Sequence, residues 1–69
     1  MNEKIYMTTR LFRLFCERYQ YTPIKGNTLF NTYKIWEYIE QAYGVLHLNG
    51  DDSALSDIET VLVSRGAVL

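Results

Sequence analysis

The sequence predicts an all-α fold, a small bundle of about four short helices that forms a single helical domain over residues 1–69. Two observations predict it: apolar residues recur at three- and four-residue steps, and pairs typical of helix starts and stops separate these stretches. With 48% hydrophobic residues and ten aromatic side chains, the chain is too apolar for disorder. A chain of 69 residues buries only about 60% of its unfolded surface, so the core must be small.

The first predicted helix covers residues 3–20 and is amphipathic. Charged side chains such as Arg10, Arg13 and Glu17 fall on the face opposite the apolar one, and the four-residue spacing of Arg13 and Glu17 predicts a stabilising pair. The inward face is predicted to consist of Ile5, Thr8, Leu11, Phe12, Phe15 and Tyr19.

The second predicted helix covers residues 23–31 and starts with a clear signal. Thr22 can cap the first turn with its hydroxyl, and Pro23 suits the first helical position. Gly26 and Asn27 weaken the helix, so packing rather than propensity must hold it.

The third predicted helix covers residues 34–48 and places the only histidine, His47, in its last turn. There an imidazole lies near free carbonyls, so we interpret His47 as structural, with Gly50 as a left-handed C-cap after Asn49. The alternative makes residues 45–48 a strand and Asn49-Gly50 a hairpin turn, but the segment that follows lacks matching alternation. The apolar stripe consists of Ile35, Trp36, Ile39, Ala42, Tyr43 and Leu46.

The last predicted helix covers residues 56–65. Ser56 and Glu59 fit a capping box, and Gly66 ends the run. Residues 51–55 form either a connector or an earlier helix start at Asp52 or Ser53.

Charge is distributed unevenly along the chain. Residues 1–34 carry six basic and two acidic side chains, a balance of +4, whereas residues 35–69 carry one basic and six acidic side chains, a balance of −5. Opposed halves favour packing on each other or on a second copy, which predicts a homo-oligomer as one outcome. A balance of +4 is small for a nucleic-acid surface that must compete with salt, so nucleic acid is the less favoured partner.

The chain lacks the residue patterns of an active site, a metal site or a cofactor site. One histidine and one cysteine, about thirty residues apart, cannot supply the three or four ligands of a zinc site. Cys16 is more typical of a small packed side chain than of a nucleophile paired with His47. The isolated glycines form no phosphate-binding loop. We therefore expect no enzymatic activity, metal or cofactor, no membrane span, and, from the lack of a signal-peptide pattern at the start, a cytoplasmic location.

Six tyrosines are too many for so small a core, and tyrosine is enriched at interfaces. Some of them should therefore be exposed and contact a partner. The candidate partner surface consists of Tyr6, Arg10, Arg13, Tyr21, Tyr33 and Tyr38.

The order of several residues resembles a family of short bacterial proteins known as domain of unknown function 3791. The residues that carry the resemblance are Leu14 to Glu17, Tyr19, Phe30, Tyr38-Ile39, Tyr43, Leu46-His47, Gly50 and Asp57-Ile58. The chain departs from the usual pattern at Thr32 to Lys34 and at Ser53 to Leu55. The resemblance implies a companion of neighbouring genes, some similar to ADP-ribosyltransferases, in an arrangement suggestive of toxin and antitoxin.

Together these observations predict a small non-enzymatic protein-binding module, antitoxin-like or accessory to the product of a neighbouring gene. The implied partner is a protein such as an ADP-ribosyltransferase-like toxin. The alternative is a small DNA-binding transcriptional regulator that uses Arg10, Arg13 and Arg18, or Lys25 and Lys34, although no recognition helix rich in basic and amide side chains is evident.

Overall fold

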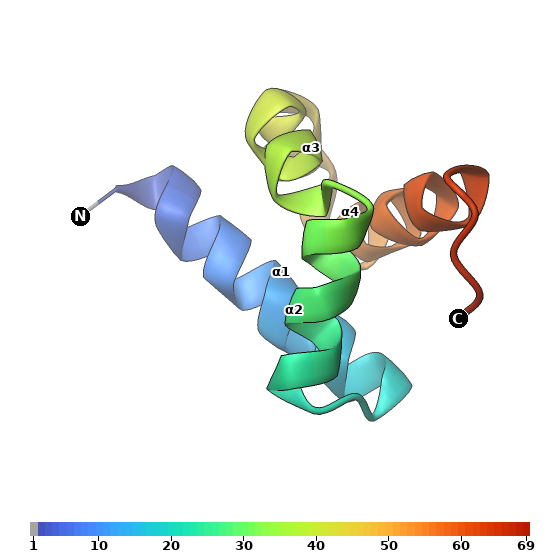
Figure 1. Ribbon diagram of the computed structural model, residues 1–69. Helices are drawn as coiled ribbons and strands as arrows, with labels where there is room; N and C mark the ends of the chain where they lie inside the picture. The colour runs from blue at the N-terminus through green and yellow to red at the C-terminus, as the bar shows by residue number, and fades with distance from the viewer. Residues whose placement is uncertain (1) are drawn as a thin grey trace.

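The computed structural model describes residues 2–69 as a bundle of four helices, and no strand occurs in that range (Figure 1). The predicted all-α fold is confirmed. The helices are α1 (Glu3–Tyr19), α2 (Pro23–Thr32), α3 (Ile35–Gln41) and α4 (Tyr43–Ser64).

The first two helices begin and end close to the predicted residues; the expected Thr22 cap forms, and Asn2 caps α1, which was not predicted from the sequence. The Asn2 side chain accepts a hydrogen bond from the Lys4 amide at 2.9 Å, and the Thr22 hydroxyl accepts one from the Lys25 amide at 3.2 Å. These bonds satisfy amides that have no partner inside the helix. α1 ends where Gln20 adopts a left-handed conformation with φ of 55°.

The prediction of one continuous third helix over residues 34–48 is wrong, because two helices occupy this range. Ala42, with φ of −94° and ψ of 10°, separates α3 from the first arm of α4, residues 43–49. Ile35 and Ile39 before this bend and Leu46 after it are all buried. The regular apolar stripe could not reveal the bend, because alanine is an excellent helix former and its presence gives no stop signal.

The predicted start of the last helix at Ser56 is wrong, and the alternative of an earlier start near Asp52 is the one that the structure favours. The second arm of α4, residues 51–64, begins directly after Gly50, which leaves the helical conformation with φ of 83° and ψ of 170°. Gly50 is therefore a sharp bend between two arms rather than a left-handed C-cap. Ser56 lies inside the second arm and therefore does not cap a helix. Its carbonyl accepts a hydrogen bond from the Thr60 hydroxyl, and Glu59 accepts one from Arg18.

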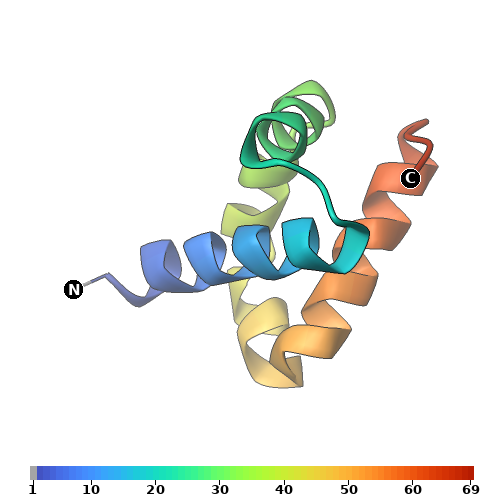
Figure 2. The same cartoon turned by 90° about the horizontal axis from the view of Figure 1, so that it is seen from below.

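The core forms where all four helices meet. Its largest fully buried side chains are Phe15, Phe30, Leu11, Ile35, Ile39, Leu46, Ile58 and Leu62. The inward face of α1 is shifted from the predicted one at its start, since Met7 is 4% exposed and Ile5 is 65% exposed. The first turns of α1 extend beyond the other helices in both views (Figures 1 and 2).

Aromatic rings link α1 to α2 and α3. The Phe12 ring contacts those of Phe30 and Trp36, each at a centroid distance of 5.2 Å, and the Phe30 and Trp36 centroids lie 4.9 Å apart. Gly26 permits the close approach of α2, because a Cβ atom there would lie 2.4 Å from the Cys16 Sγ. The glycine that weakens α2 as an isolated helix therefore allows it to pack.

The oppositely charged halves of the chain pair within one molecule. Arg10 of α1 bonds Asp51 at 3.0 Å, and Arg18 contacts Asp52 at 3.6 Å and Glu59 at 2.6 Å. All three ion pairs join α1 to the second arm of α4, which lies beside the later turns of α1 (Figure 2). The charge pattern predicted that the two halves pack on each other or on a second copy, and the structure shows them packed on each other.

Candidate functional site

The six predicted partner residues lie in three separate depressions of the surface, two in each. Tyr33 and Tyr38 line one of about 430 Å³, Arg13 and Tyr21 line a second of about 560 Å³, and Tyr6 and Arg10 line a third of about 210 Å³. The prediction of a single partner surface from these residues is therefore too simple. The three depressions differ in the charges that surround them.

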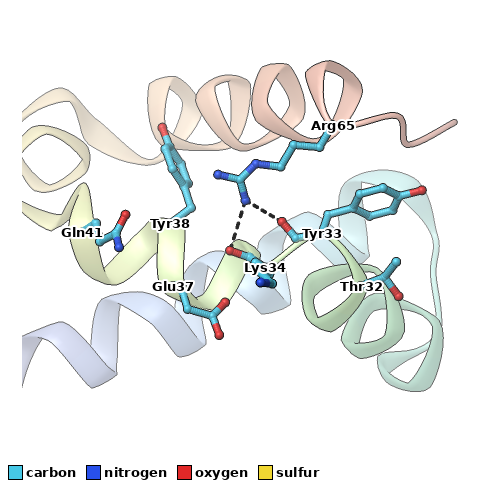
Figure 3. Close-up of a pocket in the computed structure, with 7 residues that line it drawn as sticks. All are labelled: Thr32, Tyr33, Lys34, Glu37, Tyr38, Gln41 and Arg65. Atoms are coloured by element: carbon cyan, nitrogen blue, oxygen red, sulfur yellow. Dashed lines mark hydrogen bonds between the residues drawn. The ribbon is translucent and has the colours of Figure 1, made fainter.

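The first depression, here named the Tyr33–Arg65 groove, lies where the turn between α2 and α3 meets the end of α4 (Figure 3). It is open to solvent and has both polar and apolar walls. Its lining residues are Thr32, Tyr33, Lys34, Glu37, Tyr38, Gln41 and Arg65.

Arg65 reaches the groove because of the way α4 ends. Gly66 has φ of 103°, its amide donates to the Val63 carbonyl at 3.0 Å, and the Ala67 amide donates to the Leu62 carbonyl at 2.9 Å. This pair of bonds is the Schellman motif, in which a glycine after the helix satisfies the last carbonyls. The predicted stop at Gly66 is confirmed, and Arg65 is placed at the helix end.

The guanidinium of Arg65 is held against the turn between α2 and α3. Its Nη1 donates to the carbonyl oxygens of Tyr33 at 2.5 Å and Lys34 at 3.3 Å. Tyr33 and Tyr38 lie on either side of the guanidinium, and its other terminal nitrogen points toward Tyr38 (Figure 3). One edge of Arg65 therefore stabilises the fold while another faces the groove.

The phenol of Tyr38 remains a hydrogen-bond donor at neutral pH. Partial burial raises its pKa, and the negative charge of Asp57 raises the pKa further, while Arg65 opposes both. Glu37 is the one carboxylate that lines the groove, and its side chain points away from the Arg65 guanidinium (Figure 3).

The third depression contains His47. The exposed His47 ring stacks on Tyr43 with centroids 5.4 Å apart and planes at 15°, and Glu3, Tyr6 and Arg10 complete the walls with Met7. The Arg10 guanidinium lies 5.4 Å from the centre of the Tyr6 ring and bonds Asp51. His47 lies near the end of the first arm of α4 as expected, and its structural role stays a prediction.

The second depression lies between the end of α1 and the start of α2 and is mainly apolar. Phe12, Cys16 and Tyr21 line it together with Arg13 and Glu17. Lys25 covers the Tyr21 ring at 4.3 Å from its centre. The predicted ion pair of Arg13 with Glu17 does not form. Within residues 2–69, the ion pairs are those of Arg10 and Arg18.

Cys16 and His47 are not brought together. Cys16 is buried beside Gly26, and burial raises the pKa of its thiol, which keeps it protonated at neutral pH. His47 lines the same depression as Arg10 of α1. Arg10 and Cys16 are six residues apart in α1, which corresponds to about 9 Å along the helix axis. This distance leaves the thiol without a neighbouring imidazole base.

Within the described residues, no group of three or more His, Cys, Asp and Glu side chains could hold a metal ion. In the same part of the chain, no helix is both long and apolar enough to cross a membrane.

Of the residues that line the groove, only Tyr33 and Tyr38 were predicted as partner residues, and Thr32, Lys34, Glu37, Gln41 and Arg65 were not. Arg65 is more than thirty residues from Tyr33, and Gln41 is a polar residue on the outer face of a helix. The predicted stop at Gly66 did place Arg65 at a helix end, but no feature of the sequence indicated that it would contact the turn between α2 and α3.

Comparison with known proteins gives one match. The family model described as protein of unknown function (DUF3791) matches residues 6–65. No curated protein and no solved structure matches the chain. The matched range contains α1 from Tyr6, both middle helices and α4 through the Arg65 that completes the groove. The chain therefore belongs to the DUF3791 family.

Proposed function

We propose that this chain is a non-enzymatic protein-binding module that acts in the cytoplasm as an antitoxin-like or accessory companion of a neighbouring gene's product. The observation that carries the proposal is the Tyr33–Arg65 groove, where two tyrosines flank an anchored arginine on an open surface. Tyrosine and arginine are, together with tryptophan, enriched among the residues that dominate binding energy at protein interfaces. The partner suggested by the resemblance is an ADP-ribosyltransferase-like toxin.

The alternative, a DNA-binding regulator, has less support from the charges. Arg10 and Arg18 are engaged by carboxylates of α4, which leaves Arg13 as the one arginine of α1 without an ion pair in the described chain. α3 follows α2 after a short turn, as in a helix-turn-helix, but its exposed face carries Glu37 and Glu40. Two carboxylates there would repel phosphates rather than attract them.

Self-association through the opposed halves stays a second prediction about partners. The ion pairs between α1 and α4 already use much of the charge that would attract a second copy. Light scattering at high protein concentration and low salt tests the prediction directly. A monomer under these conditions would contradict it, and a dimer that dissociates in salt would support it.

The proposed function is tested by capture of the neighbouring gene product on the immobilised chain, beside a DNA-binding assay at two salt concentrations. We expect the neighbouring product to be retained in a stoichiometric complex and DNA not to bind specifically. Specific DNA binding that weakens steeply with salt, with no protein retained, would favour the regulator instead.

A further inference from the structure

We propose that the Tyr33–Arg65 groove binds an acidic segment of the partner protein, with a glutamate or aspartate carboxylate of that segment on Arg65 and Lys34. This inference rests on the proposed protein-binding function and adds the location of the surface and the chemistry of the ligand.

The anchoring of Arg65 favours carboxylate binding. Its Nη1 is fixed by two backbone carbonyls, so the side chain has already lost much of the conformational freedom that binding would otherwise cost. The other terminal nitrogen faces the groove toward Tyr38 (Figure 3). Guanidinium groups bind carboxylates through charge-assisted hydrogen bonds, which are about twice as strong as neutral ones.

The balance of charge distinguishes this groove from the other depressions. Lys34 and Arg65 line it against one carboxylate, Glu37. In the second depression, between α1 and α2, the charge of Arg13 is balanced by Glu17. In the third depression, which contains His47, the charge of Arg10 is balanced by Glu3, and Arg10 is already bonded to Asp51. Counted over the lining side chains, the Tyr33–Arg65 groove is the one of these three with an excess of positive charge, and the lysines near the other two, Lys25 and Lys4, lie over the rings of Tyr21 and Tyr43.

The remaining walls suit an acidic side chain on a peptide better than a bare anion or a nucleic acid. The Tyr38 phenol and the Gln41 amide can donate hydrogen bonds to a carboxylate, and the two tyrosine rings can contact its aliphatic stem. The carboxylates of Glu37 in the groove and Asp57 near Tyr38 oppose a continuous line of phosphates, and the whole chain has a net charge of −1. A short acidic peptide segment therefore fits best.

The test is a nuclear magnetic resonance titration of the whole chain with two blocked pentapeptides. One alternates leucine with glutamate, and the other has glutamine in place of each glutamate. We expect the glutamate peptide to shift the amide signals of residues 32–41 and 65–66, and the glutamine peptide to bind at least about threefold more weakly, as a partly exposed charge pair would require.

Two pairs of variants sharpen the test. Glu37→Gln removes the one carboxylate of the groove and should tighten glutamate-peptide binding by about two- to fivefold, whereas Glu40→Gln, which lies outside the groove, should leave it unchanged. Lys34 has φ of 56°, and asparagine tolerates this conformation, so Lys34→Asn removes the charge without new strain and should weaken binding. Lys25→Gln is its control at a distant surface.

The proposal is overturned if the two peptides bind equally, if the shifts appear outside the groove, or if Glu37→Gln fails to tighten binding. Tighter binding of a five-nucleotide thymidine strand than of the glutamate peptide at this groove would overturn it in favour of nucleic acid. The titration uses no partner protein, so it fails independently of the capture experiment. A captured partner with no peptide binding would keep the protein-binding function and reject this groove as its acidic-segment site.

Discussion

At the scale of single residues, the four glycines have different roles that the sequence alone does not separate. A Cβ atom at Gly26 would collide with Cys16 and lie 3.1 Å from the Phe12 ring, whereas one at Gly44 would meet nothing within 4 Å. Gly50 and Gly66 are required for another reason, since both have positive φ. Close approach and backbone conformation are thus two independent reasons for glycine in one short chain.

This difference predicts effects of opposite sign for the same substitution. Gly26→Ala should lower the free energy of unfolding by about 1–3 kcal/mol, because α2 must move away from α1. Gly44→Ala should raise it by up to about 1 kcal/mol, because alanine favours the helix and the space is open. Urea unfolding measures both. The double variant Gly26→Ala with Cys16→Ala should recover part of the loss, and no recovery would contradict the contact.

The tyrosines and the cysteine predict a loss of stability in alkaline solution. Burial raises the pKa of the phenols of Tyr19 and Tyr38 above 10.0 and that of the Cys16 thiol above 9.0. The unfolded chain therefore loses these protons at lower pH than the folded chain. The free energy of unfolding that comes from the three protonated groups is complete below about pH 9 and declines as the pH rises through their folded pKa values. Urea unfolding between pH 7 and 11 should show this decline, and Tyr38→Phe should make it shallower. A decline that Tyr38→Phe leaves unchanged would exclude Tyr38 as a contributor.

At the scale of helices, local signals predicted the limits of α1 and α2 and the end of α4, but not the bends at Ala42 and Gly50 or the start of the second arm of α4. Thr22-Pro23 and Gly66 act at their own positions through backbone hydrogen bonds and φ values, so the sequence indicates them directly. The bend at Ala42 depends on how Ile39 and Leu46 both reach the core, which is a property of the packed molecule. Ser56 and Glu59 form a plausible capping box, but a helix that begins at residue 51 passes straight through it.

The bend at Gly50 predicts a test of the two arms of α4. Its φ of 83° and ψ of 170° lie in a region that is essentially restricted to glycine. Gly50→Ala should therefore lower the free energy of unfolding by about 1–3 kcal/mol although no atom lies near its Cβ. A synthetic chain with D-alanine at position 50 is the matched control and should keep its stability, because a D-residue prefers positive φ. Equal losses in both chains would indicate a steric cause instead.

At the scale of the whole molecule, the sequence predicted the class of fold, but it did not predict how the candidate residues are grouped on the surface. The predicted partner residues are divided among three depressions, two of which include residues from the α4 end of the chain, Arg65 in one and Tyr43 and His47 in the other, while the third lies between α1 and α2. The opposed charges predicted two arrangements, and only the fold shows that Arg10 and Arg18 are engaged internally. Contacts between residues far apart in the chain could not be predicted from the sequence, above all the contact of Arg65 with the turn between α2 and α3.

Protein binding through the Tyr33–Arg65 groove can be tested by hydrogen–deuterium exchange of the chain alone and mixed with the neighbouring gene product. We expect slower exchange over residues 32–41 and 65–66 in the mixture, because residues of those segments line the groove. We expect little change in α1 around Arg13, which lines a different depression. Unchanged exchange along the whole chain, or protection confined to α1, would show that the partner does not bind at this groove.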